Sequence, residues 1–176
     1  RALAYSSDGR LLASAGKDQT IILWDTQTNA PIGNSLSGHT NWINGLAFSP
    51  DNKMLISVGI DGTIRRWDTA NGKITGQPIT PTSTELWSVA YAPNGKTFAT
   101  GDKDGSIQLW DAKSGESVGK PLIGHTDLIY ALTYNPTGTM LASASGDGTI
   151  RLWDADTGEA IGEPLAEHSG SVLSLA

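Results

Sequence analysis

Short runs of alternating apolar and polar residues, separated by turn residues, fill almost the whole chain. In one representative stretch the runs cover residues 42–49, 53–58, 63–68 and 73–79. Alternation with a period of two residues is typical of β-strands that bury one face. The turns between these runs are Pro50-Asp51-Asn52, Asp61-Gly62 and Ala70-Asn71-Gly72, and each has a residue that favours a turn or tolerates positive φ. The pattern therefore predicts an all-β protein built from antiparallel four-stranded meanders.

This four-run unit repeats along the chain. The eight residues 147–154, which read Asp-Gly-Thr-Ile-Arg-Leu-Trp-Asp, recur in related form at 18–25, 61–68 and 104–111. The tryptophans of the four copies are each 43 residues apart. A period in the forties that ends in Trp-Asp is typical of a four-stranded propeller blade.

We therefore expect a single β-propeller segment over residues 1–176, with four four-stranded antiparallel blades. The expected blades span approximately 1–37, 38–80, 81–123 and 124–166, followed by a partial inner strand at 171–176. An open stack of four blades leaves two apolar faces that need cover. The blades are thus expected to be part of a larger ring, or half of an eight-bladed ring that two copies close as a homodimer.

Composition narrows the classes of function. The formal net charge is −6 and the only adjacent basic pair is Arg65-Arg66, so no nucleic-acid partner is expected. The chain has no cysteine, which excludes disulfides, cysteine-ligated zinc and a cysteine nucleophile and agrees with a reducing, cytoplasmic location. No apolar run approaches the ~20 residues that span a bilayer, so no membrane partner is expected.

The four Trp-Asp pairs, Gly38-His39, Gly124-His125 and the turn aspartates resemble the WD-repeat β-propeller family, and the likeness covers essentially the whole chain. The regular phrase at residues 161–165 is similar to bacterial WD arrays. The resemblance implies a repeat protein that serves as a protein-interaction scaffold, with no cofactor.

The resemblance also implies a structural hydrogen-bond tetrad inside each blade. In the second blade its members are His39, Ser57, Asp61 and Trp67, and in the fourth His125, Ser143, Asp147 and Trp153. The third blade has Thr82 in place of histidine, together with Thr100, Asp104 and Trp110. The first blade retains Ser14, Asp18 and Trp24, and His168 is a tetrad histidine without the rest of its blade.

A set of Ser, His and Asp residues also suggests a hydrolase. A catalytic triad, however, occurs once in a protein, whereas this set recurs with the blades and always includes a tryptophan. We therefore expect no enzymatic activity and keep a hydrolase only as a remote alternative. All three histidines are assigned to tetrads, so no metal site is expected.

WD-repeat proteins commonly bind partners through the top face of the propeller. We define the top face by the side chains that flank the first buried residue of each inner strand and by the residue before each turn aspartate. The positions expected there are Arg1, Lys17, Trp42, Asn44, Ile60, Glu85, Trp87, Lys103, Leu128, Tyr130, Gly146, Ser171 and Leu173. Aromatic side chains among scattered charges are typical of protein-interaction hot spots. The sequence thus favours a non-catalytic scaffold that binds a peptide or protein; the alternative is a self-assembling half-propeller, a homo-oligomer.

Overall fold

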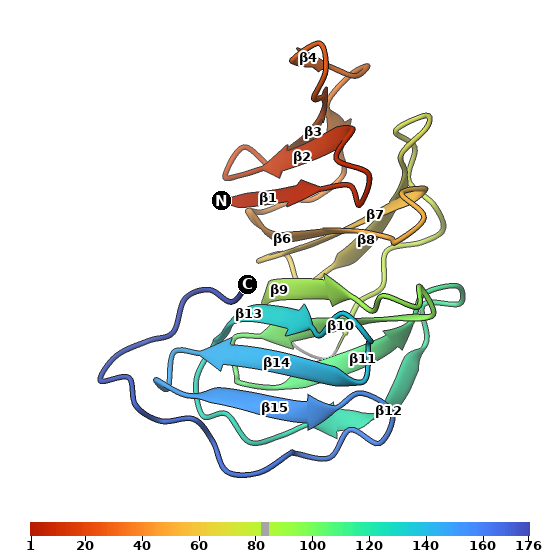
Figure 1. Cartoon of the computed structure of the whole chain (residues 1–176). Coiled ribbons are helices and arrows are strands. Elements are labelled where there is room, and N and C mark those ends of the chain that lie inside the picture. Colours follow the sequence, from red (N-terminus) through yellow and green to blue (C-terminus); the bar gives the residue numbers. More distant parts are fainter. Residues whose placement is uncertain (82–84) are drawn as a thin grey trace. The chain divides into compact units, whose positions relative to one another are not determined.

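The computed structural model describes residues 1–81 and 85–176, and all regular secondary structure in these ranges is β-strand. The strands form two compact units, unit 1 over residues 1–86 and unit 2 over residues 87–176. Each unit contains two antiparallel sheets (Figure 1). The all-β prediction and the antiparallel sheets are confirmed.

Unit 1 contains the first and second blades. The strands of the first blade are β1 (Ala2–Tyr5), β2 (Leu11–Ala15), β3 (Thr20–Asp25), β4 (Ala30–Pro31) and β5 (Leu36–Ser37), and those of the second are β6 (Ile43–Phe48), β7 (Met54–Gly59) and β8 (Ile64–Asp68). Consecutive strands from β1 to β3 and from β6 to β8 pair antiparallel, as a meander requires. Both short strands, β4 and β5, pair with β3.

Unit 2 contains the third and fourth blades. Its strands are β9 (Leu86–Tyr91, whose first residue is the last of unit 1), β10 (Thr97–Asp102), β11 (Ile107–Asp111), β12 (Ser117–Leu122), β13 (Ile129–Tyr134), β14 (Met140–Ser145) and β15 (Ile150–Asp154). The third blade has the full order β12-β11-β10-β9. The fourth blade has the order β13-β14-β15.

The outermost strand departs from the expectation of four regular strands in every blade. It is continuous only as β12; in the first blade it is split into β4 and β5. In the second and fourth blades it consists of two isolated bridges each, of which Ile64–Ile79 and Ile150–Leu165 are the more C-terminal. A glycine with positive φ lies in the middle of this segment in all four blades and turns the backbone away from the ladder: Gly33, Gly76, Gly119 and Gly162.

The C-terminal segment also differs from the prediction. Residues 171–176 form no strand, because a strand requires a neighbour and these residues have no pairing partner of their own blade in the described ranges. Val172 is nevertheless buried, and its N–H donates to the carbonyl of Ser145 at 3.0 Å. The N–H of Ile43 makes the equivalent bond to Gly16 at 3.2 Å, so the first buried residue of one repeat covers the blade before it.

Each unit has a core between its two blades. In unit 1, β6 packs against β1 and β2, and the buried cluster joins Ile21 and Leu23 of β3 with Leu46 and Phe48 of β6. In unit 2, β13 packs against β10 and a second cluster fills the space between them. Each fully buried Leu, Ile or Phe side chain stabilises the fold by about 1.5–3 kcal/mol. Packing between neighbouring blades therefore contributes strongly to stability.

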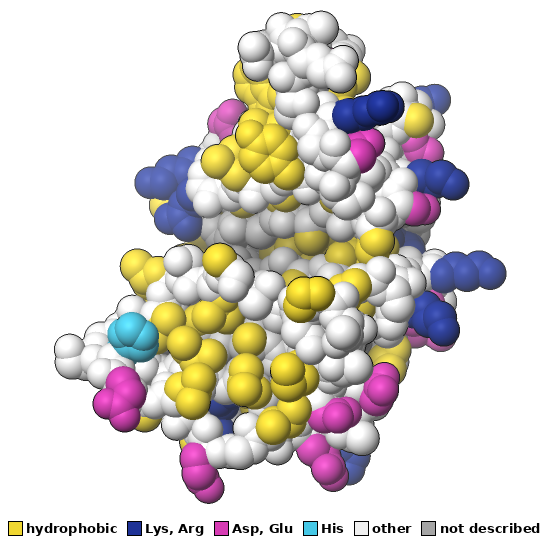
Figure 2. All heavy atoms as spheres, in the orientation of Figure 1, with side chains coloured by type: hydrophobic (Ala, Val, Ile, Leu, Met, Phe, Trp, Pro, Cys, Tyr) yellow, Lys and Arg dark blue, Asp and Glu magenta, His cyan; other side chains and the backbone are white. Residues whose placement is uncertain are grey.

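One sheet face of the first blade and one of the fourth blade are not packed against a neighbouring blade of the same unit. Leu3 and Tyr5 of β1 are 71% and 66% exposed, whereas Leu46 and Phe48, one repeat later, are buried. In the fourth blade Leu152 is half-buried, while its counterpart Leu109 in the third is buried. Figure 2 shows hydrophobic side chains gathered over β14 and β15 of unit 2. Each unit therefore presents one apolar sheet face to solvent.

The tight turns repeat their backbone conformation as strictly as the strands. Besides the glycine of the outer segment, three turn positions per blade have positive φ, a region that favours glycine and that L-residues other than asparagine rarely adopt. They are Gly9, Asn52, Gly95 and Gly138 in the first turn, Gln19, Gly62, Gly105 and Gly148 in the second, and Asn29, Gly72, Gly115 and Gly158 in the third. Gln19 is the exception in residue type, with φ of 67°.

Candidate functional site

The Ser, His and Asp side chains of the second blade form one continuous network. His39 Nδ1 lies 2.9 Å from Asp61 Oδ2, and His39 Nε2 lies 2.7 Å from Ser57 Oγ. The indole N–H of Trp67 donates to the same Ser57 Oγ at 2.8 Å. The network thus connects the turn that precedes β6 with three other parts of the blade: β7, β8 and the turn between these two strands.

The direction of each proton follows from the groups involved. An ionised carboxylate only accepts, so His39 Nδ1 carries a proton, and in the tautomer with its single proton on Nδ1 the Nε2 atom is an acceptor. The Ser57 hydroxyl must then donate to Nε2, while its lone pair accepts the Trp67 indole proton. Every polar atom of the network therefore has a partner, which is what burial demands.

The fourth blade repeats the arrangement. His125 Nδ1 lies 2.8 Å from Asp147 Oδ2, and His125 Nε2 lies 2.8 Å from Ser143 Oγ. Trp153 Nε1 donates to Ser143 Oγ at 2.8 Å. Two blades from different units have the same distances to within 0.1 Å for these contacts, so the repeat extends to side-chain geometry.

The environment shifts the proton affinities of these groups. Burial alone would raise the pKa of Asp61, but hydrogen bonds from His39, the Thr40 N–H and Thr63 outweigh burial and hold the pKa well below its usual range. The pKa of Asp147 is lowered in the same way by Thr149, the Thr126 N–H and His125, against the effect of burial.

The pKa of His125 is lowered as well. Burial disfavours the imidazolium, and the nearby charge of Arg151 adds to this effect. The hydrogen bond to Asp147 and its negative charge act in the opposite direction without cancelling the shift. His125 is therefore neutral at pH 7 and is in the protonation state that the network needs.

The first and third blades have shorter networks. Trp24 donates to Ser14 at 2.8 Å, and Trp110 donates to Thr100 at 2.8 Å. Asp18 accepts from the Thr20 hydroxyl at 3.1 Å, as Asp61 does from Thr63 in the second blade. Thr82, expected at the histidine position of the third blade, lies outside the described residues.

The turn of the third blade contains a second aspartate beside Asp104. The side chain of Asp104 is exposed, and the carboxylate that orders this turn belongs to Asp102, which accepts from the N–H groups of Asp104 and Ser106 at 2.9 Å each. Asp102 is buried in a position that the other blades give to Gly16, Gly59 and Ser145.

The geometry of these networks does not suit a hydrolase, although Ser57, His39 and Asp61 stand in the order of a catalytic triad. The serine side of the triad is closed: Ser57 and Ser143 are both 0% exposed. The lone pair of each hydroxyl accepts a tryptophan N–H. A substrate carbonyl would need to reach the serine oxygen, and the packed blade prevents that approach.

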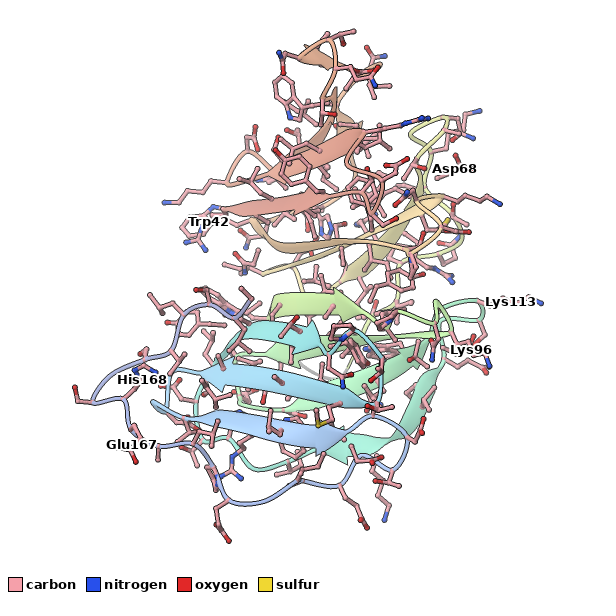
Figure 3. The ribbon with its side chains drawn as sticks, in the orientation of Figure 1. Trp42, Asp68, Lys96, Lys113, Glu167 and His168 are labelled. Atoms are coloured by element: carbon pink, nitrogen blue, oxygen red, sulfur yellow. The ribbon has the colours of Figure 1, made fainter. Side chains whose placement is uncertain are left out.

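Four of the expected top-face residues come together in unit 1. The guanidinium carbon of Arg1 lies 4.5 Å from the centroid of the Trp42 ring, and Lys17 Nζ lies 4.4 Å from it. Arg1 Nη1 also donates to Asn44 Oδ1 at 2.9 Å. Figure 3 shows Trp42 at one edge of unit 1, beside the start of β1. Two cations therefore gather on one indole ring.

The remaining top-face residues are placed by backbone contacts. Ile60 N–H donates to the carbonyl of Trp42 at 2.9 Å, which holds the loop before β6 against the turn after β7. In unit 2, Gly146 N–H makes the equivalent bond to Leu128 at 2.9 Å. Ile60 and Leu128 are half-buried, as are Glu85 and Lys103.

Unit 2 contributes an aromatic pair to its top face. Trp87 and Tyr130 meet edge to face, with ring centroids 5.9 Å apart and an angle of 82° between the rings. Both side chains are half-buried and occupy equivalent positions of neighbouring inner strands. An edge-to-face pair is held by the ring quadrupoles and presents a rigid apolar surface.

Sequence reasoning omitted the threonine of each Asp-Gly-Thr turn. Thr63 Oγ1 lies 2.8 Å from Asp61 Oδ1 and 3.3 Å from His39 Nδ1, and Thr149 occupies the same place beside Asp147. The signal was available, because a threonine or serine follows every turn aspartate by two residues. The role of Asp102 had a weaker signal, namely a carboxylate at a position otherwise occupied by small residues.

Within residues 1–81 and 85–176, no three His, Cys, Asp or Glu side chains are grouped so that they could hold a metal ion. The same part of the chain contains no helix long and apolar enough to span a membrane.

Comparison with known proteins identifies the family. The model for "WD domain, G-beta repeat" matches residues 1–25, 31–68, 73–111 and 115–154, and each match ends at the aspartate of a Trp-Asp pair. The chain belongs to the WD40-repeat family. Thirty-eight residues of this WD40 chain are 53% identical to the nuclear distribution protein PAC1 of Coprinopsis cinerea. That match spans 22% of this chain and 8% of that protein, which is less than one 43-residue repeat.

The last WD40 histidine of the chain lies apart from the networks. His168 is exposed, and Figure 3 shows it next to Glu167 on the loop that leads from the fourth blade to the C-terminus. His39 and His125 precede their first buried strand residues by four positions, and His168 precedes Val172 by the same interval.

Proposed function

We propose that this WD40-repeat chain is a non-catalytic scaffold that binds a peptide or protein partner on its top face. The family generally acts in this way, and the side chains of each unit support it. The proposal is supported by aromatic rings at expected top-face positions in both units: Trp42 with its two cations in unit 1, and the Trp87–Tyr130 pair in unit 2.

These rings have the properties of binding anchors. Tryptophan and tyrosine supply a large contact area at a low cost in side-chain entropy, and they dominate measured hot spots. Trp42, Trp87 and Tyr130 are only half-buried, so part of each ring remains available to a partner. The buried tryptophans of the Trp-Asp pairs are instead committed to the blade networks.

A peptide selection would test the proposal. Random peptides displayed on phage would be selected against the 176-residue chain, and the best binder measured by calorimetry. We expect Trp42→Ala or Trp87→Ala to weaken binding at least tenfold, since hot-spot truncations cost about 2 kcal/mol or more. Tyr5→Ala is the matched control, because Tyr5 is an exposed aromatic residue on a sheet face.

Two results would reject this assignment. Binding that survives both tryptophan substitutions in folded protein would place the partner site elsewhere. Binding that is lost equally in the Tyr5→Ala control would place it on the open sheet face of the first blade. Circular dichroism of each variant establishes that the fold is retained.

Self-assembly is a second candidate, favoured by the uncovered sheet faces of the first and fourth blades. Leu3 and Tyr5 are exposed on one, and Met140, Ile161 and Leu165 are exposed in the blade that carries the other. A second copy that covered both faces would bury apolar area in a defined homodimer. Light scattering should then give twice 18.5 kDa, and Leu3→Glu should reduce the mass to that of one chain. A chain that is monomeric at high concentration would reject this role.

A further inference from the structure

We infer that the Trp42 cluster of unit 1, made of Arg1, Lys17, Trp42 and Asn44, recognises an acidic side chain, Asp or Glu, in a bound peptide. The inference rests on the proposed function and adds the chemistry of the ligand. Its basis is the convergence of two cations on a single aromatic ring.

The two cations are held in different ways. Arg1 stacks at 4.5 Å from the centroid of the Trp42 ring and also donates to Asn44 Oδ1 at 2.9 Å, which fixes the orientation of its guanidinium. Lys17 Nζ is held by the ring at 4.4 Å. A π face attracts an ammonium without accepting a directed hydrogen bond, so it positions Lys17 while leaving the N–H donors to another acceptor.

The charges around the cluster favour an anion. Two like charges beside one ring repel each other, and a carboxylate between them would relieve that repulsion. Asp18, adjacent to Lys17 in sequence, directs its carboxylate to the Thr20 hydroxyl and N–H. Asp61 is committed to His39 and the Thr40 N–H. The cluster therefore brings two cationic side chains together on a chain whose net charge is −6.

The form of the cluster favours a peptide over a polyanion. A nucleic acid requires a row of cations along its backbone, and the overall negative charge of the chain would repel it. Here two cations flank one flat apolar ring, which suits a carboxylate next to an apolar side chain. A peptide that alternates Glu and Leu presents both groups at adjacent positions.

The test uses two synthetic peptides, acetyl-Gly-Glu-Leu-Glu-Leu-Gly-amide and its twin with Gln in place of both Glu. The indole N–H signal of Trp42 would be followed by NMR in the full 176-residue chain during titration. We expect the Glu peptide to shift this signal and to bind at least about threefold more tightly than the Gln twin, since an exposed ion pair contributes up to about 1 kcal/mol. Raising the salt concentration should remove the difference.

Two variants and one control separate charge from fold. Lys17→Gln and Arg1→Gln should each reduce the preference for the Glu peptide by about twofold to fivefold and leave binding of the Gln twin unchanged. Lys73→Gln removes the same charge from an exposed lysine in the outer segment of the second blade, and should leave the preference intact.

Each other outcome has one meaning. Equal binding of the two peptides, with loss of both in Trp42→Ala, would overturn the acidic specificity and keep the proposed top-face function. If neither peptide binds and the phage selection also yields no binder, both the acidic specificity and the proposed top-face function are rejected. A twin carrying phosphoserine in place of Glu that binds more than tenfold tighter would show a phosphate site and overturn the assignment to Asp or Glu.

Discussion

His39 Nδ1 lies 2.9 Å from Asp61 Oδ2, although 22 residues separate the two side chains in sequence. This contact fastens the loop before β6 to the turn between β7 and β8. The same loop carries Trp42, an expected top-face residue, three residues after His39. A buried structural network therefore sets the position of a surface side chain that we propose binds a partner.

The serine of the network should matter more to stability than an isolated buried hydroxyl. Ser57→Ala removes the hydrogen-bond partner of both His39 Nε2 and Trp67 Nε1. Each buried unsatisfied group costs about 1–3 kcal/mol, so we expect the free energy of unfolding to fall by about 2–4 kcal/mol. Urea denaturation followed by tryptophan fluorescence measures the change.

Ser14→Ala in the first blade is the matched comparison. Ser14 accepts from Trp24 in the same way, but the structure describes no histidine partner for it. The fall in the free energy of unfolding should be about half as large for Ser14→Ala as for Ser57→Ala. Equal losses in the two blades would mean that the histidine bond contributes nothing to stability.

Acid should destabilise the protein in two stages. The folded pKa of His125 lies below its ordinary value of 6.5, so the unfolded chain binds more protons and stability falls as the pH drops through about 6.5 and below. Asp61 and Asp147 also have lowered pKa values in the folded state, and their contribution, fully present above their ordinary value of 3.8, is lost as the pH falls below it.

Thermal unfolding between pH 8 and pH 3 would reveal both stages. His125→Asn should flatten the upper stage, and Asp61→Asn should reduce the lower one while lowering stability at pH 7. A melting temperature independent of pH over this whole range would contradict the ionisation states assigned to the networks.

Gln19 offers a stabilising substitution. Its φ of 67° is unfavourable for an L-residue with a long side chain, and the other three blades have glycine at this position. Gln19→Gly should raise the free energy of unfolding by about 0.5–1 kcal/mol, because relief of backbone strain outweighs the added freedom of the unfolded chain. Gly62→Ala, the reverse change in the second blade, should destabilise, and urea midpoints would compare the two.

The two aspartates of the third-blade turn lead to a paired prediction. Asp102→Ala removes the acceptor of two backbone N–H groups and should cost about 1–2 kcal/mol. Asp104→Ala removes an exposed side chain and should change stability by less than about 0.5 kcal/mol. If Asp104→Ala were the more damaging change, the turn of this blade would follow the Asp61 pattern.

The repeat explains how much the sequence could predict. Alternation and turn glycines fix strands such as β7 and β14, because side chains of a half-buried strand must alternate and each hairpin needs positive φ at a defined position. Family membership follows from the four Trp-Asp pairs, and the family model confirms it. These features depend on local residues that recur 43 positions apart, so each copy supports the interpretation of the others.

Other features depend on contacts that a single repeat does not contain. The outer segment has a central glycine in every blade, yet only β12 forms a continuous strand, and residue types within the segment do not distinguish it. The approach of Lys17 to Trp42 joins residues of two different blades. The sequence predicts that Lys17 and Trp42 share the top face, but the distance between them depends on how the two blades pack.

The bond from Ile43 N–H to the Gly16 carbonyl, and its counterpart from Val172 to Ser145, shows that the first and fourth blades are each completed by a residue of the following repeat. The junction between blades is thus encoded within the 43-residue unit and lies inside any contiguous copy of it. Duplication of one unit in the gene would insert a blade together with a compatible junction, whatever the point at which the copy begins. Arrays of this kind can change in length by single recombination events without a new interface having to evolve.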